Sequence, residues 1–266
     1  MNTKQFLTIV FLAGNFTASA NIFEDISLWW KGKEEEVISH EHALTTKSHI
    51  SIENSYGDIT IATWKQPKIM LEATKIGSET SVKNAKIDLT YTKNGLTIKT
   101  VNLNPNEKCK IVFSIIVPSD AVLDSVKTDS GNIVVKSITT PVSITSNYGD
   151  ITVTEAYHSV NAYTKNGSIT ISTMPTLTSE NRIIAFTEKG TITLQVPEES
   201  NAHVCATTLR GHVSTEQPIT LDPRTIKIST RTLAQLKKDV QGSLGDGKGP
   251  HVKLHTNKGN IKLVAS

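Results

Sequence analysis

A short repeat constrains the fold of this chain more than any other feature. Each copy has a glycine in a polar turn, followed by residues that alternate between apolar and polar. Internal repetition at a short interval is the signature of proteins built from stacked units. The seven copies are Tyr56–Ile61, Ser130–Val135, Tyr148–Val153, Asn166–Ile171, Lys189–Leu194, Arg210–Thr215 and Lys258–Leu263.

The residues around each glycine predict a strand on both sides of the turn. From Gly131 onward the glycines follow at intervals of 18, 18, 23 and 21 residues, and apolar residues stand five and seven positions before most glycines and two and four positions after them. Around Gly149 these residues are Val142, Ile144, Ile151 and Val153. Alternate residues of a strand share one face, so the four form an interior stripe.

Such a stripe is buried only when neighbouring copies stack on one another. The outward positions are mainly Thr, Ser, Lys and Asn, which is typical of a solvated face. We therefore predict an all-β fold, a β-solenoid or β-helix-like roll of strand-turn-strand repeats. The number of faces and the handedness stay open.

The region between the first and second copies has a different pattern. Residues 87–92 and 96–98 flank an Asn94-Gly95 pair, which predicts an antiparallel hairpin. Residues 111–117 follow as a more fully buried strand that ends at Pro118. We expect this antiparallel element near the N-terminal end to cap the first repeats and to protect an exposed sheet edge.

Two features precede the last copy. Residues 232–240 could form one short helical turn, and residues 242–249 are rich in glycine. The second segment matches a phosphate-binding loop except that Gly249 stands where Ser or Thr would hold magnesium. A strand, His251 to His255, is expected after it instead of the required helix, so we interpret the segment as a flexible turn.

The N-terminus has the features of a secretory signal peptide: Lys4, an apolar stretch from Phe6 to Phe16, and the small residues Ala18-Ser19-Ala20. The apolar stretch is too short to span a bilayer, and we expect no stable membrane span after cleavage. The predicted organisation is a signal peptide at 1–20, a linker at 21–36 and a single β-repeat domain at 37–266. Export places the protein in the periplasm, on the cell surface or outside the cell.

The overall charge gives no indication of a nucleic-acid partner. The net charge is +3, and loss of Lys4 with the signal peptide leaves 27 basic residues against 25 acidic ones. A nucleic-acid-binding domain carries a clear basic excess. We therefore expect no nucleic acid among the partners.

The two cysteines, Cys109 and Cys205, reach an oxidising compartment if the chain is exported. Strand alternation places Cys109 on the face of Ile111, whereas Cys205 lies opposite the face of Val204 and Ala206. The opposed faces argue against a disulfide, although the sequence alone does not decide whether the two residues pair.

Histidine pairs invite a metal-binding hypothesis. His40 with His42 and His251 with His255 could share strand faces, but no third ligand at suitable spacing completes either set. We interpret them as exposed strand histidines and expect neither a metal site nor a cofactor.

Carboxylates invite the hypothesis of a polysaccharide-cleaving enzyme. Asp58 and Asp150 follow the corner glycines of their copies, but other copies have Asn, Ser, Thr or His at that position. Small polar residues at such a position fit turn capping better than catalysis. No nucleophile motif is present either, so we name no catalytic, cofactor-binding or metal-ligating residue.

The chain resembles the bacterial putative-adhesin family of β-strand-repeat domains of unknown function. The resemblance covers residues 37–265 and rests on the repeated Gly-Asp/Asn-Ile turns, on Ile116-Val117-Pro118-Ser119, on Val252-Lys253-Leu254 and on Gly259-Asn260-Ile261. It implies no set of binding or catalytic residues.

Together with the repeat, this resemblance predicts an exported, non-catalytic protein, a putative adhesin or an envelope-associated binding or structural protein. Its flat polar face, with occasional tyrosines at 56, 148 and 163, would bind an unknown glycan, an envelope component or a surface protein. Tyr148 and Tyr163 fit packing at turns or edges equally well, so we do not name them as site residues. The alternatives are a β-helix enzyme acting on polysaccharide and self-assembly through the ends of the stack.

Overall fold

The computed structural model describes residues 34–92, 94–102, 104, 108–222 and 238–266. They belong to one compact unit, Glu34–Ser266. The predicted signal peptide and residues 21–33 of the predicted linker lie outside the described residues. Residues 34–36, which we also placed in the linker, are the first residues of a strand.

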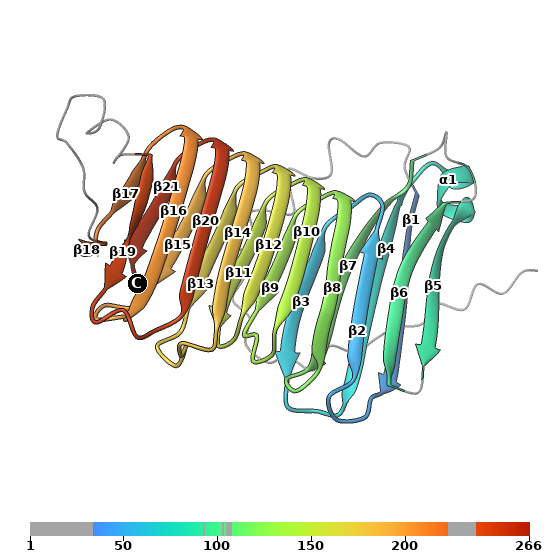
Figure 1. Ribbon diagram of the computed structural model, residues 1–266. Helices are drawn as coiled ribbons and strands as arrows, with labels where there is room; N and C mark the ends of the chain where they lie inside the picture. Colours follow the sequence, from blue (N-terminus) through green and yellow to red (C-terminus); the bar gives the residue numbers. More distant parts are fainter. Residues whose placement is uncertain (1–33, 93, 103, 105–107, 223–237) are drawn as a thin grey trace, which may run out of the picture. The chain divides into compact units, whose positions relative to one another are not determined.

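The described unit is all-β, as predicted, and consists of two large mixed sheets (Figure 1). In spatial order the ten-stranded sheet contains β1 (Glu34–Ala43), β4 (Lys68–Gly77), β7 (Lys110–Pro118), β3 (Ile59–Trp64), β9 (Ile133–Lys136), β11 (Ile151–Ala156), β13 (Ile169–Thr173), β15 (Ile192–Val196), β21 (Ile261–Ala265) and β17 (Val213–Thr215). The eleven-stranded sheet contains β18 (Ile219–Leu221), β19 (Asp239–Leu244), β16 (Ala202–Arg210), β20 (His251–Lys258), β14 (Arg182–Lys189), β12 (Val160–Asn166), β10 (Val142–Tyr148), β8 (Val122–Ser130), β2 (His49–Asn54), β6 (Gly95–Asn102) and β5 (Ala85–Thr92).

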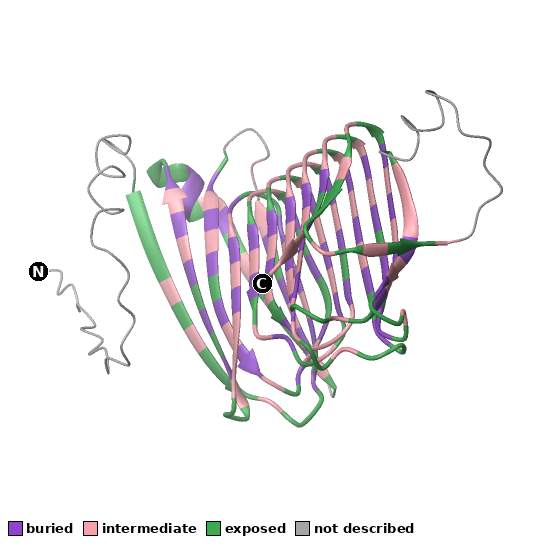
Figure 2. Cartoon of the chain, turned by 90° about the vertical axis from the view of Figure 1, so that its left-hand side faces the viewer, coloured by how far each residue is buried: buried purple, intermediate pink, exposed green. Residues whose placement is uncertain are grey.

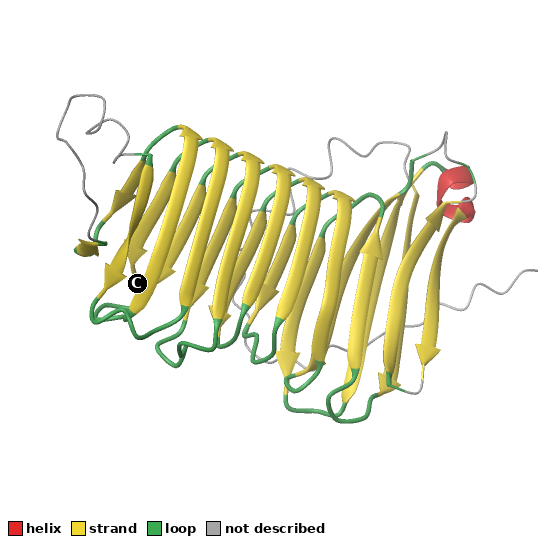
Figure 3. Ribbon diagram, viewed as in Figure 1, coloured by secondary structure: helices red, strands yellow, loops and turns green. Residues whose placement is uncertain are grey.

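Each glycine-centred copy contributes one strand to each sheet, which confirms the predicted strand-turn-strand unit. Neighbouring copies pair in parallel and in register, so that Val142 lies beside Val160 in one sheet and Ile151 beside Ile169 in the other. The turns that contain the repeated glycines lie side by side along the top of Figure 3. We call these glycines the corner glycines, and we call the edge that their turns form the corner edge.

The predicted interior stripe forms the core between the two sheets. The four stripe residues around Gly149 are all buried. Burial alternates along nearly every strand (Figure 2). At about 25 cal/mol for each Å² of buried apolar surface, this stacked interior supplies the main favourable term in folding.

A second interior column, which we did not predict, consists of polar side chains. The residue three positions before each corner glycine is buried, and in six copies its hydroxyl group donates to the glycine carbonyl of the neighbouring copy. These donors satisfy carbonyl groups that would otherwise be buried without a partner. The column consists of Asn54, Thr128, Ser146, Thr164, Thr187, Thr208 and Thr256.

The close stacking of corners explains why glycine is required there. Gly149 has a φ of +150°, and a Cβ atom added to it would lie 2.0 Å from the carbonyl oxygen of Gly131. Both the backbone conformation and the space therefore exclude a larger residue.

The N-terminal end of the stack is closed by antiparallel strands, as predicted. β5 and β6 form the hairpin around Asn94-Gly95, and β1 pairs with β4, which in turn pairs antiparallel with β7. The expectation that residues 111–117 are more fully buried was wrong: their buried residues alternate with half-buried or exposed ones, because one face of β7 points away from the core. A short helix, α1 (Glu79–Asn84), was not predicted; Ser78 caps it by accepting a hydrogen bond from the Ser81 N–H group.

At the C-terminal end the order of copies in space differs from their order in the chain. The last copy, β20 and β21, lies between β14–β15 and β16–β17. The predicted helical turn at 232–240 is wrong for Asp239 and Val240, which begin β19, and residues 232–237 lie outside the described residues. Residues 242–244 also belong to β19 and not to a loop, because they pair antiparallel with β16.

Candidate functional site

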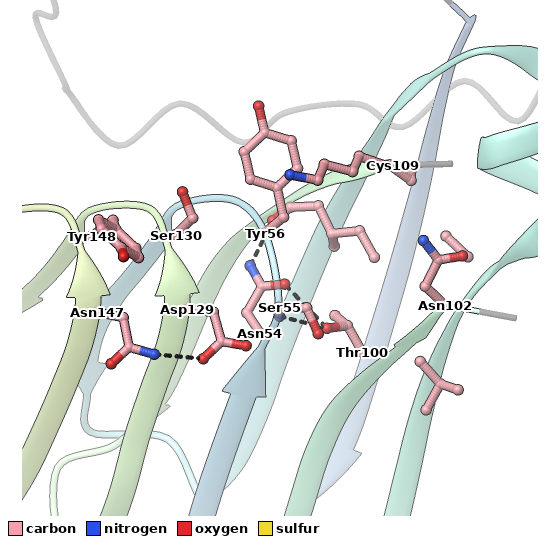
Figure 4. Close-up of a pocket in the computed structure, with 14 residues that line it drawn as sticks. Asn54, Ser55, Tyr56, Thr100, Asn102, Cys109, Asp129, Ser130, Asn147 and Tyr148 are labelled. Carbon is pink, nitrogen blue, oxygen red and sulfur yellow. Dashed lines mark hydrogen bonds between the residues drawn. The ribbon is translucent and has the colours of Figure 1, made fainter. Parts of the chain in front are cut away.

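A pocket of about 620 Å³ opens on the corner edge near the N-terminal end (Figure 4). It forms where the regular pattern of corners is interrupted. In the copies that contain a corner glycine, usually only two residues join the first strand of the copy to the second. By contrast, β6 and β7 are joined by residues 103–109. The connection beside the corner of the Gly57 copy is therefore several residues longer than a corner turn.

The inner wall of the pocket is a saturated hydrogen-bond network. The buried Asn54 amide donates to the carbonyl groups of Gly57 (3.1 Å) and Ile111 (2.8 Å) and accepts a hydrogen bond from the Thr100 hydroxyl (3.2 Å). The Thr100 hydroxyl in turn accepts from the Ser55 N–H group (2.9 Å). Because these groups fix one another, the inner wall is preorganised for a ligand.

The rim of the pocket carries two exposed tyrosines. Tyr56 and Tyr148 are 40% and 55% exposed, which is high for large aromatic residues. Beside them the Asn147 amide donates to the Asp129 carboxylate at 3.0 Å. Tyrosine rings offer an apolar surface with a polar tip, and the adjacent amide and carboxylate can exchange hydrogen bonds with hydroxyl groups.

Cys109 lines the pocket and is buried. Burial raises the pKa of its thiol, which keeps the group protonated and weakly nucleophilic near neutral pH. Both cysteines are free, which confirms the argument against a disulfide. Cys205 lies half-buried on the opposite side of the strand from Val204 and Ala206, as predicted.

The carboxylates considered for catalysis are engaged in structural contacts. Asp58 accepts a hydrogen bond from the Asn132 N–H group (2.8 Å) and forms an ion pair with Lys110 (2.8 Å). Asp150 accepts from the Ser168 N–H group at 2.7 Å. The capping interpretation is confirmed, with the difference that each side chain caps the neighbouring copy and not its own turn.

The histidine pairs lie on strands, as predicted, but not all are exposed. His42 and His251 are exposed, whereas His40 and His255 are half-buried. His40 and His42 both contact the ring of Tyr91, which belongs to the edge strand of the other sheet. No group of three or more His, Cys, Asp or Glu residues placed to hold a metal ion occurs in the described part of the chain.

Tyr163 lies on the outer face of the eleven-stranded sheet and not at the pocket. Its ring stacks on Phe186, which stacks on His255, with centroid separations of 5.4 and 5.1 Å. The three tyrosines that we proposed for one flat face therefore lie on two different surfaces, because Tyr56 and Tyr148 precede corner glycines.

The fold has solved counterparts. A putative cell adhesion protein from Clostridium sporogenes is 10% identical over 87% of this chain and all of its own, with a TM-score of 0.51. The two proteins share a fold. A putative adhesin from Bacteroides fragilis (14% identity, TM-score 0.34) and a putative lipid binding protein from Parabacteroides distasonis (11% identity, TM-score 0.28) also match, covering 87% and 86% of this chain and 97% and 96% of theirs.

Comparisons of sequence give no further relatives: no protein-family model and no curated protein matches the chain. The name of the Clostridium sporogenes protein agrees with the resemblance to bacterial putative adhesins. At these identities it establishes the fold alone. Within the described residues, no helix has the length and apolar character needed to cross a membrane.

Proposed function

We propose that this chain is an exported, non-catalytic binding protein of the bacterial cell envelope, adhesin-like in role, and that its domain is a β-solenoid. The parallel register of successive copies supports the solenoid. We also infer that cleavage follows Ala20, so that the exported protein begins at Asn21. Its N-terminal sequence would test this boundary.

The observation that carries the proposed function is the tyrosine-rimmed pocket. Its preorganised wall and its two exposed rings suit a ligand that has both apolar faces and hydroxyl groups. Sugars have this combination. We infer that the pocket binds a glycan of the cell envelope or of a surface that the cell contacts.

A glycan array tests this proposal. Purified protein should bind a subset of glycans saturably, and Tyr148→Ala should weaken that binding about tenfold, since truncation of an aromatic anchor costs more than about 1 kcal/mol. Tyr163→Ala is the matched control because that ring lies outside the pocket. If Tyr148→Ala and Tyr163→Ala bind glycan equally well, the pocket is not the glycan-binding site.

A reducing-sugar assay on every bound glycan distinguishes binding from cleavage. A binding protein releases no sugar. If the protein releases reducing sugar and either Asp58→Asn or Asp150→Asn abolishes that release, the protein is a polysaccharide-cleaving enzyme and the proposal is wrong.

A further inference from the structure

A row of basic residues lies on the corner edge at the end opposite to the pocket. Lys189, Lys258 and Arg210 each stand directly before a corner glycine, in three copies that are neighbours in space. The Gly190 N–H group donates to the Lys258 carbonyl (2.9 Å), and the Gly259 N–H group donates to the Arg210 carbonyl (3.0 Å). β14, β20 and β16 thus end side by side, at the top of Figure 1.

The three side chains are exposed. None of them forms an ion pair with a described residue. The nearest carboxylate in sequence, Glu188, accepts a hydrogen bond from the Tyr163 hydroxyl (3.1 Å) on the outer face of the sheet. Like charges on adjacent strands repel each other, so the row costs stability in the free protein.

The flanking residues are polar and uncharged or weakly basic. Thr191, Asn260 and His212 follow the same three glycines, and Asn260 accepts a hydrogen bond from the His212 N–H group (3.1 Å). The row therefore combines a line of positive charge with hydroxyl, amide and imidazole groups, which can exchange hydrogen bonds with a polyhydroxylated ligand.

We propose that this basic row binds a linear acidic polysaccharide, with successive carboxylates of the polymer facing Lys189, Lys258 and Arg210. Neighbouring strands are about 4.8 Å apart. A polyuronate carries one carboxylate on each sugar ring, and the length of one ring is close to this spacing. The advance of the polymer per sugar ring is therefore close to the spacing of the three basic residues, whose long side chains can reach carboxylates on either side of the polymer.

Nucleic acid fits the row less well. The chain has no strong basic excess, which a nucleic-acid-binding domain carries. The proposal deepens the glycan-binding role, but it does not require the pocket, because the copy centred on Gly167 lies between the two sites.

The test is a binding titration with polygalacturonate, and with its methyl ester as the uncharged probe. We expect binding to polygalacturonate alone, and it should weaken as salt is raised. Lys258→Gln should reduce the affinity about fivefold, which is the scale of one exposed ion pair. The triple variant Lys189→Gln, Lys258→Gln, Arg210→Gln should reduce it about 100-fold.

Lys262→Gln is the matched control, because Lys262 is exposed on the same strand pair but on the outer face of the ten-stranded sheet. Equal loss in Lys262→Gln and Lys258→Gln would overturn the proposal, as would equal binding of the methyl ester or tighter binding of single-stranded DNA. Tyr148→Ala separates the two sites: it should leave polygalacturonate binding unchanged, even if the pocket proves to bind no glycan.

Discussion

The buried hydroxyl column makes a strong prediction about stability. Thr164 is fully buried, and its hydroxyl donates to the Gly149 carbonyl at 2.9 Å. At this corner the backbone hydrogen bonds run from the Gly149 and Ile151 N–H groups, and among the described residues no backbone N–H donates to the Gly149 carbonyl. Thr164→Val keeps the shape of the side chain but leaves that carbonyl without a partner.

An unsatisfied buried carbonyl costs about 1–3 kcal/mol. We therefore expect Thr164→Val to lower the free energy of unfolding by about 2 kcal/mol. For a domain of this size, this corresponds to a fall in Tm of roughly 4–8 °C. Urea unfolding at equilibrium, followed by circular dichroism, measures the free energy, and a thermal scan measures the Tm.

The control is Thr170→Val, the same substitution on a half-buried outward position of β13. Its effect should stay within about 0.5 kcal/mol, as for most surface substitutions. If the two variants unfold with the same free energy, the hydroxyl column does not stabilise the corners and the reasoning is refuted.

Two further predictions concern the cysteines and the order of copies. Because burial raises the pKa of the Cys109 thiol, its reaction with a thiol reagent should be slow at pH 8 and should accelerate only at higher pH, and the less buried Cys205 should react first. Mass spectrometry of the labelled peptides measures both rates. Faster labelling of Cys109 would contradict its buried position. Deletion of residues 251–266 should remove hydrogen-exchange protection from β16 and β19 but not from β10 and β12, because β16 pairs only with β19 and β20 among the described strands. Continued protection of β16 would show that it has paired directly with β14.

Much of the unit structure followed from the sequence. The alternation around Gly149 predicted two strands and an interior stripe, and the Asn94-Gly95 pair predicted the hairpin. The outward position of Cys205 followed from the same alternation. These features depend on the conformations of a few consecutive residues, so local chemistry determines them.

Other features were visible in the sequence but were not recognised. The Ser, Thr or Asn three positions before each glycine, of which Thr164 is one, was a repeated signal for the hydroxyl column. Its meaning is clear only when the glycine carbonyl of the adjacent copy is in place, since the bond joins two copies. Ser78 was likewise a helix N-cap signal that the surrounding strand pattern obscured.

The sequence by itself determined the strand-turn-strand structure and the interior stripe of each copy, and the tertiary structure decided which copies are neighbours. The pocket exists because β6 and β7 lie beside the Gly57 copy, and the basic row exists because the last copy, with Lys258, lies between those of Lys189 and Arg210. All copies present the same stripe and the same backbone edge, so many stacking orders satisfy the local pattern equally well. Only the lengths and pairings of the segments between copies, which act over the whole domain, select one of them.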